Sequence, residues 1–368
     1  MLHVTELKKY YEHMKSIVTS EYSIHFNSKC YTELNAYLKK SNFSKIVVIV
    51  DTNTHNYCYP YFIEKVETNL EIEIIEIEAG EIHKTIDTCV GVWNALSELN
   101  VDKKSLIINL GGGMVTDLGG FVASTYRRGL KYINVPTSLL AMVDASVGGK
   151  TGVDLNTLKN QIGVINTAQM ILVDTHLLSS LPQNEIRSGF AEMLKHGLIQ
   201  SEAYWNSLKD LSMSTHQDFD DLIYESILIK QDIVDLDPFE NNLRKTLNFG
   251  HTLGHAIESY YLSKQKKQAL LHGEAIAIGM VLATYISREL LGFSDIMCEE
   301  IKTTLIKIFD KVKINREDID PIIELLKHDK KNEYGNINFV LLDAIGKPKI
   351  NCSVDNEIII NSFKYYNS

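Results

Sequence analysis

The segment LIINLGGGMVTD (Leu106–Asp117) decides the fold class. A short apolar run ends in three glycines and passes directly into a pattern typical of a helix. Many α/β proteins bind a diphosphate at such a strand-to-helix turn, because glycines let the backbone approach the ligand near the positive end of the helix. A tight turn without a ligand has the same sequence, so the motif needs support from the rest of the chain.

Further β-branched runs surround this segment in the first half of the chain, and helical patterns separate them. The runs are KIVVIVD (Lys45–Asp51), EIEIIEIEAG (Glu71–Gly80), YINVP (Tyr132–Pro136) and MILVD (Met170–Asp174). Strands that alternate with helices predict an α/β domain with a mostly parallel, Rossmann-like sheet.

The pattern changes at SSLPQNE (Ser179–Glu185), after which amphipathic helices dominate. We expect these helices at residues 185–199, 221–235, 250–262, 273–290 and 295–309. INFVLLD (Ile337–Asp343) reads as a strand, expected to form half of a hairpin that turns at residues 334–336. The chain is therefore predicted to have an α/β domain over residues 1–180 and a mainly helical domain over residues 181–368.

Composition narrows the possible function. The chain has 368 residues, of which 45% are hydrophobic and 23% charged, as in a folded globular protein. Its formal net charge of −10 argues against nucleic acid or an anionic membrane as a partner. The five cysteines form no CxxC pair, and no signal or membrane-spanning segment is evident, so we expect a cytoplasmic protein.

Polar residues near the strand ends support a dinucleotide site. Asp51 ends a strand, Glu81 and Lys84 lie in AGEIHK, and Thr137 and Ser138 follow another strand. The second glycine-rich segment, SVGGKTG (Ser146–Gly152), lacks the spacing of a P-loop, so ATP hydrolysis is not supported. In an exposed turn its lysine, Lys150, could hold a phosphate or carboxylate, with Lys159 and Asn160 as further donors.

Histidines in the second half predict a metal site. His251 and His255 are four residues apart and share a helix face, His272 opens the next helix, and Glu192 lies on a third helix. Two imidazoles and one carboxylate suit catalytic Zn²⁺ with an open coordination position. The spacing does not decide between His251 and His255, and Thr252 excludes the HExxH pattern.

Cationic residues gather in the same segments. In a chain of net negative charge they suggest a substrate with two anionic groups. They are Lys195, His196, Lys230, Arg244 and the run HDKK (His328–Lys331).

An ordered series of motifs from Asp51 to Lys331 resembles the 3-dehydroquinate synthase family. The motifs are GEIHK, GGGMVTDLGGFVASTYRRG, VPTSLLAMVDASVGGKTGVD, LKNQIG, SGFAEMLKHG, RKTLNFGHTLGHAIE, LHGEAIAIGM and HDKK. The resemblance implies a shikimate-pathway enzyme that converts 3-deoxy-D-arabino-heptulosonate 7-phosphate to 3-dehydroquinate and phosphate. The implied steps are NAD-dependent oxidation, phosphate elimination, reduction and aldol cyclisation, a carbon–oxygen lyase reaction in the cleft between the domains.

The resemblance also implies site residues where positions match the family. A Zn²⁺ or Co²⁺ site would be formed by Glu192, His251 and His272, which selects His251 over His255. NAD would bind at Asp51, Glu81, Lys84, Gly112, Gly113, Met114, Val115, Thr116, Asp117, Thr137, Ser138 and Lys159. Substrate-binding or catalytic positions are Asp144, Lys150, Asn160, Lys195, Lys230, Arg244, Asn248, His255 and one lysine of Lys330 and Lys331.

Roles within this set follow from the same match. The phosphate would be held by Lys150, Asn160, Asn248 and His255, and the carboxylate by Lys230 and Arg244. Lys195 and His255 are expected to move protons. Arg128 matches a residue that reaches the active site of the neighbouring subunit, so a homodimer is implied.

Three other functions are compatible with parts of the pattern. A valiolone or deoxy-inosose type of sugar phosphate cyclase would share cofactor, metal and fold, although Asn248 and His255 argue against it. A metal-dependent polyol dehydrogenase would leave Lys150, Lys230 and Arg244 without a role. A binding protein that has lost catalysis is disfavoured because every expected ligand position is occupied.

Overall fold

The computed structural model describes residues 14–156, 158–211, 219–264, 269–326 and 337–368. The chain forms two units, one of Met1–Ile186 with Phe219–Ile227 and the other of Arg187–Asp218 with Leu228–Ser368. The sequence predicts a boundary near residue 180. It does not predict that the later segment Phe219–Ile227 belongs to the first unit.

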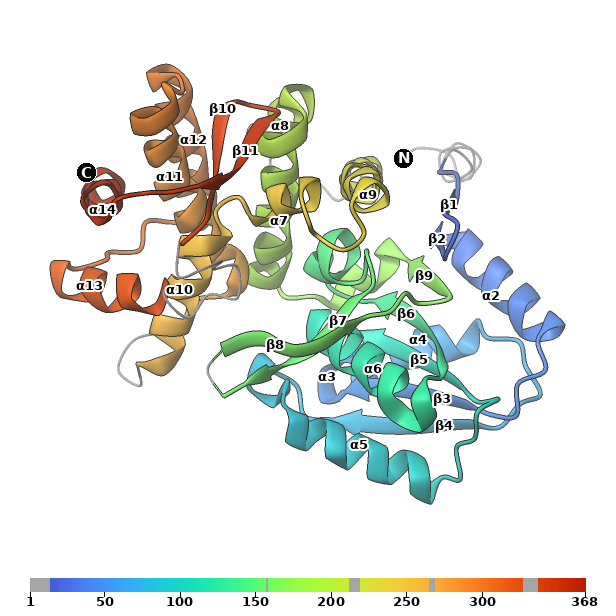
Figure 1. Ribbon diagram of the computed structural model, residues 1–368. Coiled ribbons are helices and arrows are strands. Elements are labelled where there is room, and N and C mark those ends of the chain that lie inside the picture. The colour runs from blue at the N-terminus through green and yellow to red at the C-terminus, as the bar shows by residue number, and fades with distance from the viewer. Residues whose placement is uncertain (1–13, 157, 212–218, 265–268, 327–336) are drawn as a thin grey trace. The chain divides into compact units, whose positions relative to one another are not determined.

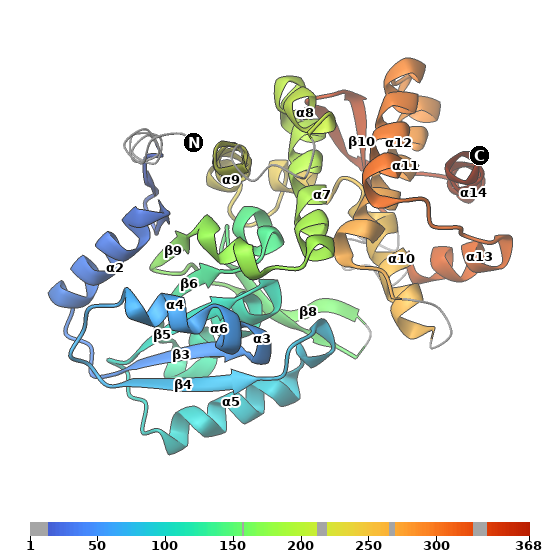
Figure 2. The same cartoon turned by 180° about the vertical axis from the view of Figure 1, so that it is seen from behind.

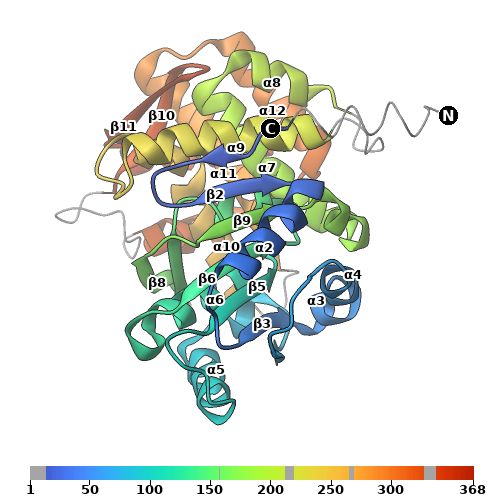
Figure 3. The same ribbon diagram turned by 90° about the vertical axis from the view of Figure 1, so that its right-hand side faces the viewer.

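A seven-stranded sheet forms the centre of the first unit, in the order β1-β2-β9-β6-β5-β3-β4. The β1–β2 pair is antiparallel and the other pairs are parallel, which confirms the predicted, mostly parallel sheet. Figure 3 shows β2, β9, β6, β5 and β3 in this sequence across the sheet. The strands are β1 (Ile17–Val18), β2 (Ser23–Phe26), β3 (Ile46–Asp51), β4 (Ile72–Ile77), β5 (Leu106–Gly111), β6 (Lys131–Pro136) and β9 (Met170–Val173).

Helices cover both faces of this sheet. The helices α5 and α6 lie on one face, and α3 and α4 lie on the other (Figure 3). The chain therefore passes from β3 to one face of the sheet and from β5 to the other. Doubly wound folds bind ligands between the carboxyl ends of two such strands. The helices of this unit are α2 (Ser28–Lys40), α3 (Thr52–Tyr57), α4 (Tyr59–Glu64), α5 (Ile86–Glu98) and α6 (Gly113–Thr125), with short turns η1 (Glu81–His83), η2 (Tyr126–Arg128) and η4 (Thr175–Ser180).

Three features of the first unit were not predicted. Two strands, β1 and β2, precede the first predicted strand. A π-helical turn, η3 (Ala141–Ala145), follows β6. An antiparallel hairpin of β7 (Lys150–Leu155) and β8 (Leu158–Ile165) then crosses the region of α6 (Figure 1). The expectation of an exposed turn around Lys150 was wrong, because Lys150 starts β7 and Val147 to Gly149 before it are buried.

The second unit is mainly helical, as predicted, and Figure 2 shows its helices beside one small hairpin. Its strand β10 (Phe339–Ala344) pairs with β11 (Lys347–Cys352), which follows it in the chain. The hairpin was predicted to turn at residues 334–336, which lie outside the described residues. The other elements are α7 (Gln183–Gln200), α8 (Glu202–Lys209), α9 (Phe219–Leu236), η6 (Leu243–Asn248), α10 (His251–Ser263), α11 (His272–Leu291), α12 (Asp295–Phe309), α13 (Arg316–Leu325) and α14 (Asn356–Asn367).

Helices α7 and α9 each begin in the first unit and continue into the second. No helix in the described part of the chain combines the length and the apolar character needed to cross a bilayer.

Candidate active site

The glycine-rich turn lies at the carboxyl edge of the parallel sheet in the first unit. β5 ends at Gly111, Gly112 caps α6, and Gly113 begins this helix. A Cβ atom on Gly112 would lie 3.2 Å from Ser138 Oγ, so glycine keeps this turn close to the segment after β6. The amide of Thr137 donates to the carbonyl of Gly111 at 3.0 Å, which joins the two strand ends.

The remaining predicted residues of this turn form the first turn of α6. Their backbone amides belong to a helix N-terminus, the part of a helix that attracts a phosphate. They are Met114, Val115 and Thr116, which are buried, and Asp117, which is partly exposed.

Asp51 ends β3 at the same edge of the sheet. Its Oδ1 accepts hydrogen bonds from the amides of Asn53 and Thr54 at 2.9 and 2.8 Å, and so caps α3. An acidic residue at the end of a strand next to the glycine turn is suited to bind the ribose of a dinucleotide.

Predicted cofactor residues meet in one ion-pair network at this edge. Lys84 is 3% exposed, and its Nζ donates to Asp117 Oδ2 at 2.6 Å and to Asn160 Oδ1 at 2.7 Å. Lys159 Nζ donates to Glu81 Oε1 at 2.8 Å. Burial alone would lower the pKa of Lys84, but the carboxylates of Asp117 and Glu81 raise it, so the lysine is charged. The network thus joins Asn160, predicted to bind substrate, to four predicted cofactor residues.

Replacing Lys84 with Met is expected to destabilise the protein by about 3 kcal/mol, because the mostly buried carboxylate of Asp117 would lose its cation. Denaturation of the cofactor-free protein would measure this loss. The double variant Lys84→Met, Asp117→Leu should recover much of the stability, since both charges of the pair are then removed. A single variant as stable as the unsubstituted protein would contradict the structural role of this pair.

The other predicted substrate residues of the first unit occupy different elements. Asp144 lies in the π-helical turn η3, a conformation that is frequent at functional sites. Lys150 is partly buried at the start of β7. Arg128 is exposed at the end of η2 and has a positive φ of 63°.

The predicted metal ligands of the second unit come from three helices and meet. Glu192 on α7 is fully buried. Its Oε1 lies 3.4 Å from His251 Nε2 on α10 and 3.6 Å from His272 Nε2 on α11. Two ligand atoms of a tetrahedral zinc ion lie about 3.4 Å apart when each bond to the metal is about 2.1 Å long. The two separations measured here are close to that distance.

The other nitrogen of each imidazole faces an acceptor. His251 Nδ1 lies 3.1 Å from the carbonyl oxygen of Phe249, and His272 Nδ1 lies 3.2 Å from Glu258 Oε2. Without a metal, burial alone would lower the pKa of His272, but Glu258 and Glu192 raise it to about 10, so this ring holds both protons. With a metal bound, a proton on each Nδ1 would satisfy both contacts and leave the Nε2 lone pairs for the cation beside Glu192. This arrangement of outer acceptors is typical of histidines that bind metals.

Glu192 itself supports a cation at this point. Its Oε2 accepts a hydrogen bond from Lys195 Nζ, whereas its buried Oε1 accepts none of normal geometry from the residues that the structure describes. Burial alone would raise the pKa of Glu192, but Lys195 and His251 hold it well below its usual value, so it is ionised. A carboxylate oxygen facing two imidazole lone pairs requires a proton or a metal ion between them, and the donor set fits Zn²⁺ or Co²⁺.

Small residues bring the three helices together. A Cβ atom on Gly279 of α11 would lie 2.0 Å from the carbonyl oxygen of Gly250, so the start of α10 touches the backbone of α11. A Cβ atom on Gly273 would lie 2.1 Å from the carbonyl oxygen of Ser188 on α7. Ser188 and Glu192 share a helix face, so this contact places His272 beside the carboxylate.

His255 belongs to the same cluster of rings. Its ring centroid lies 5.1 Å from that of His251 and 5.7 Å from that of His272. One nitrogen of each of these three histidines lies within 4.8 Å of the others, so His255 can also face a ligand there. Lys330 and Lys331 lie outside the described residues.

Helix α9 and the segment between α9 and α10 carry the other predicted anion-binding residues. Arg244 is 2% exposed, and its Nη1 donates to the carbonyl oxygen of Pro238 at 2.6 Å. Asp237 accepts from the amide of Arg244 at 3.0 Å and from those of Asn241 and Asn242, which fixes this loop. Lys230, on α9, is 5% exposed.

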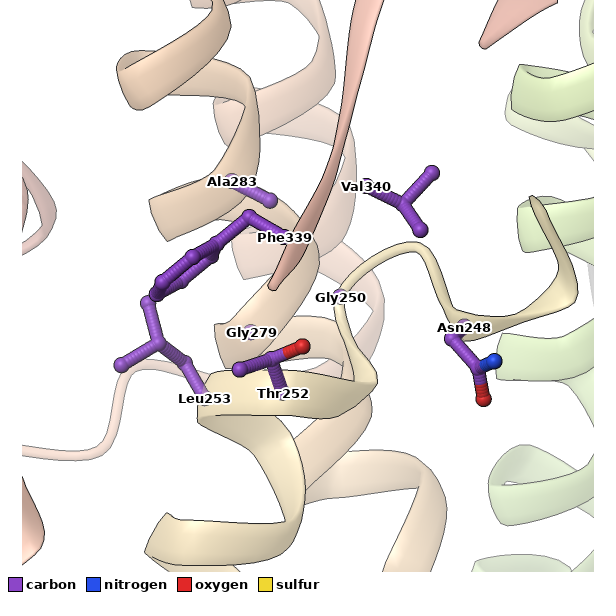
Figure 4. A pocket seen from close by; sticks show the side chains of 8 residues that line it. All are labelled: Asn248, Gly250, Thr252, Leu253, Gly279, Ala283, Phe339 and Val340. Carbon is purple, nitrogen blue, oxygen red and sulfur yellow. The ribbon is translucent and has the colours of Figure 1, made fainter. Parts of the chain in front are cut away.

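Asn248 lies at the end of this segment, and its Nδ2 donates to Glu240 Oε1 at 2.9 Å. Figure 4 shows Asn248 and Gly250 on the loop before α10, beside a narrow gap that Thr252, Phe339 and their neighbours line. The Asn248 side chain points away from Phe339. The side chain is therefore oriented by Glu240 and not by the apolar residues of the gap.

Sequence reasoning missed three acidic residues around this site, namely Asp237, Glu240 and Glu258. Each of them forms a polar contact with another residue of the site. None belongs to a sequence motif with a recognisable spacing. The one available signal was the density of acidic and amide residues in DLDPFENN (Asp235–Asn242) between two helices.

Solved structures share this fold. A 2-deoxy-scyllo-inosose synthase complexed with carbaglucose-6-phosphate, NAD⁺ and Co²⁺ is 25% identical, with a TM-score of 0.82 over 95% of this chain and 99% of the other. A 2-epi-5-epi-valiolone synthase from Streptomyces hygroscopicus, with NAD⁺ and Zn²⁺ bound, is 22% identical, with a TM-score of 0.81 over 96% of this chain and 99% of the other.

Sequence relatives are closer. A 3-dehydroquinate synthase from Parabacteroides distasonis is 40% identical over 337 residues, which cover 91% of this chain and 95% of the relative. One from Dictyoglomus thermophilum is 38% identical over 342 residues, covering 91% and 93%. The family models for the N-terminal and C-terminal parts of 3-dehydroquinate synthase match residues 74–188 and 189–332. The predicted resemblance is confirmed, and the chain belongs to the 3-dehydroquinate synthase family.

Proposed function

We propose that this protein converts 3-deoxy-D-arabino-heptulosonate 7-phosphate to 3-dehydroquinate and phosphate, as a carbon–oxygen lyase that uses NAD and Zn²⁺ or Co²⁺. The observation that carries the proposal is the meeting of Glu192, His251 and His272, in a chain 40% identical to a 3-dehydroquinate synthase. The 25% identical inosose synthase, with its NAD⁺ and Co²⁺, supports the choice of cofactors.

Each unit supplies residues for one part of this chemistry. When bound, NAD⁺ would accept and return a hydride, and the metal would polarise a substrate hydroxyl. In the first unit, the glycine turn and Asp51 would hold the dinucleotide. In the second unit, Glu192, His251 and His272 would hold the metal.

The substrate has two anionic groups, and buried cations are suited to bind them. Lys195, Lys230 and Arg244 are between 1% and 5% exposed, and a buried cation is stable only near anionic or polar groups. Lys230 and Arg244 would bind the carboxylate. The phosphate would be bound by Lys150, Asn160, Asn248, His255 and the partner subunit's Arg128.

Proton transfer is assigned to Lys195 and His255. Lys195 donates to the Glu192 carboxylate, and the ring of His255 lies edge-on to that of His251 and tilted to that of His272, so each would lie beside the place where a substrate hydroxyl binds. Orientation would supply much of the rate enhancement, since fixed geometry can contribute about 7–11 kcal/mol.

Two further parts of the proposal concern the enzyme in the cell. We place it in the cytoplasm, consistent with five free cysteines. We also propose a homodimer, because Arg128 is exposed at the position that matches a residue acting on the neighbouring subunit.

A substrate comparison tests this function. The protein would be incubated with Zn²⁺, a small amount of NAD⁺, and either the heptulosonate phosphate or sedoheptulose 7-phosphate. We expect phosphate release from the heptulosonate alone, in excess of the NAD⁺ supplied, because the cofactor is regenerated in each turnover. Release from sedoheptulose 7-phosphate alone would overturn the proposal, and accumulation of NADH with a simple polyol would identify a dehydrogenase.

A further inference from the structure

A buried carboxylate lies behind one of the proposed metal ligands. Glu258 on α10 is 7% exposed, and its Oε2 lies 3.2 Å from His272 Nδ1 on α11. The opposite nitrogen of the same ring, His272 Nε2, lies 3.6 Å from Glu192 Oε1. The imidazole is thus held between two carboxylates, one of which is a proposed ligand and one of which is not.

The fold brings this carboxylate to the ring for a local reason. His251, His255 and Glu258 are spaced by four and three residues, so they lie along one face of α10. A Cβ atom on Gly254 of this helix would lie 3.1 Å from Ile276 Cα of α11, so the two helices are in close contact. A glutamate one turn beyond His255 can therefore reach the first residue of α11.

The two proposed ligand histidines are oriented differently. His251 Nδ1 faces a backbone carbonyl, that of Phe249, which no substitution removes. His272 Nδ1 faces a side chain, that of Glu258. A substitution of the acceptor can therefore change the orientation of His272 but not that of His251.

We propose that Glu258 is a positioning residue for the metal site, an inference that rests on the proposed function. It accepts the proton on His272 Nδ1, which fixes the ring plane and directs the Nε2 lone pair toward Glu192. Its negative charge also makes Nε2 a stronger donor to a cation. Glu258 does not contact the reacting atoms, and acts through His272.

Two substitutions separate the charge of Glu258 from its hydrogen bond. In Glu258→Gln the amide oxygen can still accept from His272 Nδ1, so the ring keeps its orientation but loses the nearby charge. In Glu258→Ala both are lost. We expect the Zn²⁺ dissociation constant to rise about 10-fold in the first variant and about 100-fold in the second, the usual range for loss of an outer acceptor.

The measurement is a competition for Zn²⁺ between the metal-free full-length protein and a chromophoric chelator, followed by the visible spectrum of the Co²⁺-loaded protein. Asp318→Asn is the matched control. Asp318 is also a buried carboxylate of the second unit, and it accepts a hydrogen bond from Tyr260 at 2.6 Å. Tyr260 is not one of the proposed metal ligands. We expect it to leave the dissociation constant and the Co²⁺ spectrum unchanged.

Other results would overturn the proposal. If Glu258→Ala binds Zn²⁺ as tightly as the unsubstituted protein, the carboxylate does not position the ligand. If Asp318→Asn weakens binding equally, the effect is a general loss of structure. If His272→Ala also retains Zn²⁺, the metal site itself is wrong, and the proposed function fails with it.

Discussion

Replacing His272 with alanine is expected to remove the metal and the activity together. The substitution deletes the Nε2 atom that lies 3.6 Å from Glu192 Oε1, and leaves only His251 and Glu192 of the three proposed ligands. Polarisation by a metal is worth several kcal/mol, so turnover should fall by about 1000-fold or more. Metal content after gel filtration and phosphate release from the heptulosonate phosphate would both be measured.

His176→Ala is the control for this experiment. His176 is exposed in the first unit and stacks on Tyr61, with 4.4 Å between ring centroids. We expect the His176→Ala protein to bind as much metal as the unsubstituted protein. A His272→Ala protein that keeps stoichiometric metal, or that turns over within tenfold of the unsubstituted rate, would contradict the assigned metal site.

Replacing Gly273 with alanine is expected to inactivate the enzyme without removing any ligand. The new Cβ atom would lie 2.1 Å from the carbonyl oxygen of Ser188, so α11 must move away from α7. The amide of Gly273 also donates to Ser188 Oγ at 2.9 Å, and this bond would lengthen. His272 would shift relative to Glu192, and a displacement of about 1 Å can reduce the rate by about 100-fold. Turnover and the Zn²⁺ dissociation constant would report the change.

Gly91→Ala provides the comparison. Gly91 lies inside α5, and a Cβ atom there would have no neighbour within 4 Å. Alanine should stabilise this helix by up to about 1 kcal/mol and leave metal binding unaffected. Unchanged turnover and metal affinity in Gly273→Ala would show that the contact between α7 and α11 does not control the site.

The fold was predictable where the periodicity of the sequence is strong. The run KIVVIVD predicts a strand at residues 45–51, and β3 spans Ile46–Asp51. The helix expected at residues 295–309 is α12, Asp295–Phe309. Burial dictates both patterns, because a central parallel strand is apolar on both faces and a surface helix on one.

The hairpin of β7 and β8 was missed because its signal is mixed. Glycines interrupt both strands, and a Cβ atom on Gly152 would lie 2.5 Å from the carbonyl oxygen of Ile162 across the pair. Asn156 lies in the connection with a positive φ of 54°, which is typical of a turn. The asparagine of this connection was therefore the signal that could have indicated a turn here.

The residue types of the site were predictable from the sequence, but the partners of each atom were not. Spacing places His251 and His255 on one helix face, and only the family resemblance selects His251. Spacing also gives no information on which nitrogen of an imidazole faces the ligand. That depends on the carbonyl of Phe249 and on Glu258, contacts that exist only after the helices have packed.

The contact between Gly250 and Gly279 has a consequence for how this protein can evolve. Main-chain atoms have no rotamers, so the spacing of α10 and α11 at this point is set by peptide geometry and not by the volumes of side chains. We therefore expect substitutions of apolar residues elsewhere in these helices to change the separation of the histidines less than a substitution at either glycine. A proposed metal site anchored in this way should tolerate divergence of its surroundings as long as these glycines are retained.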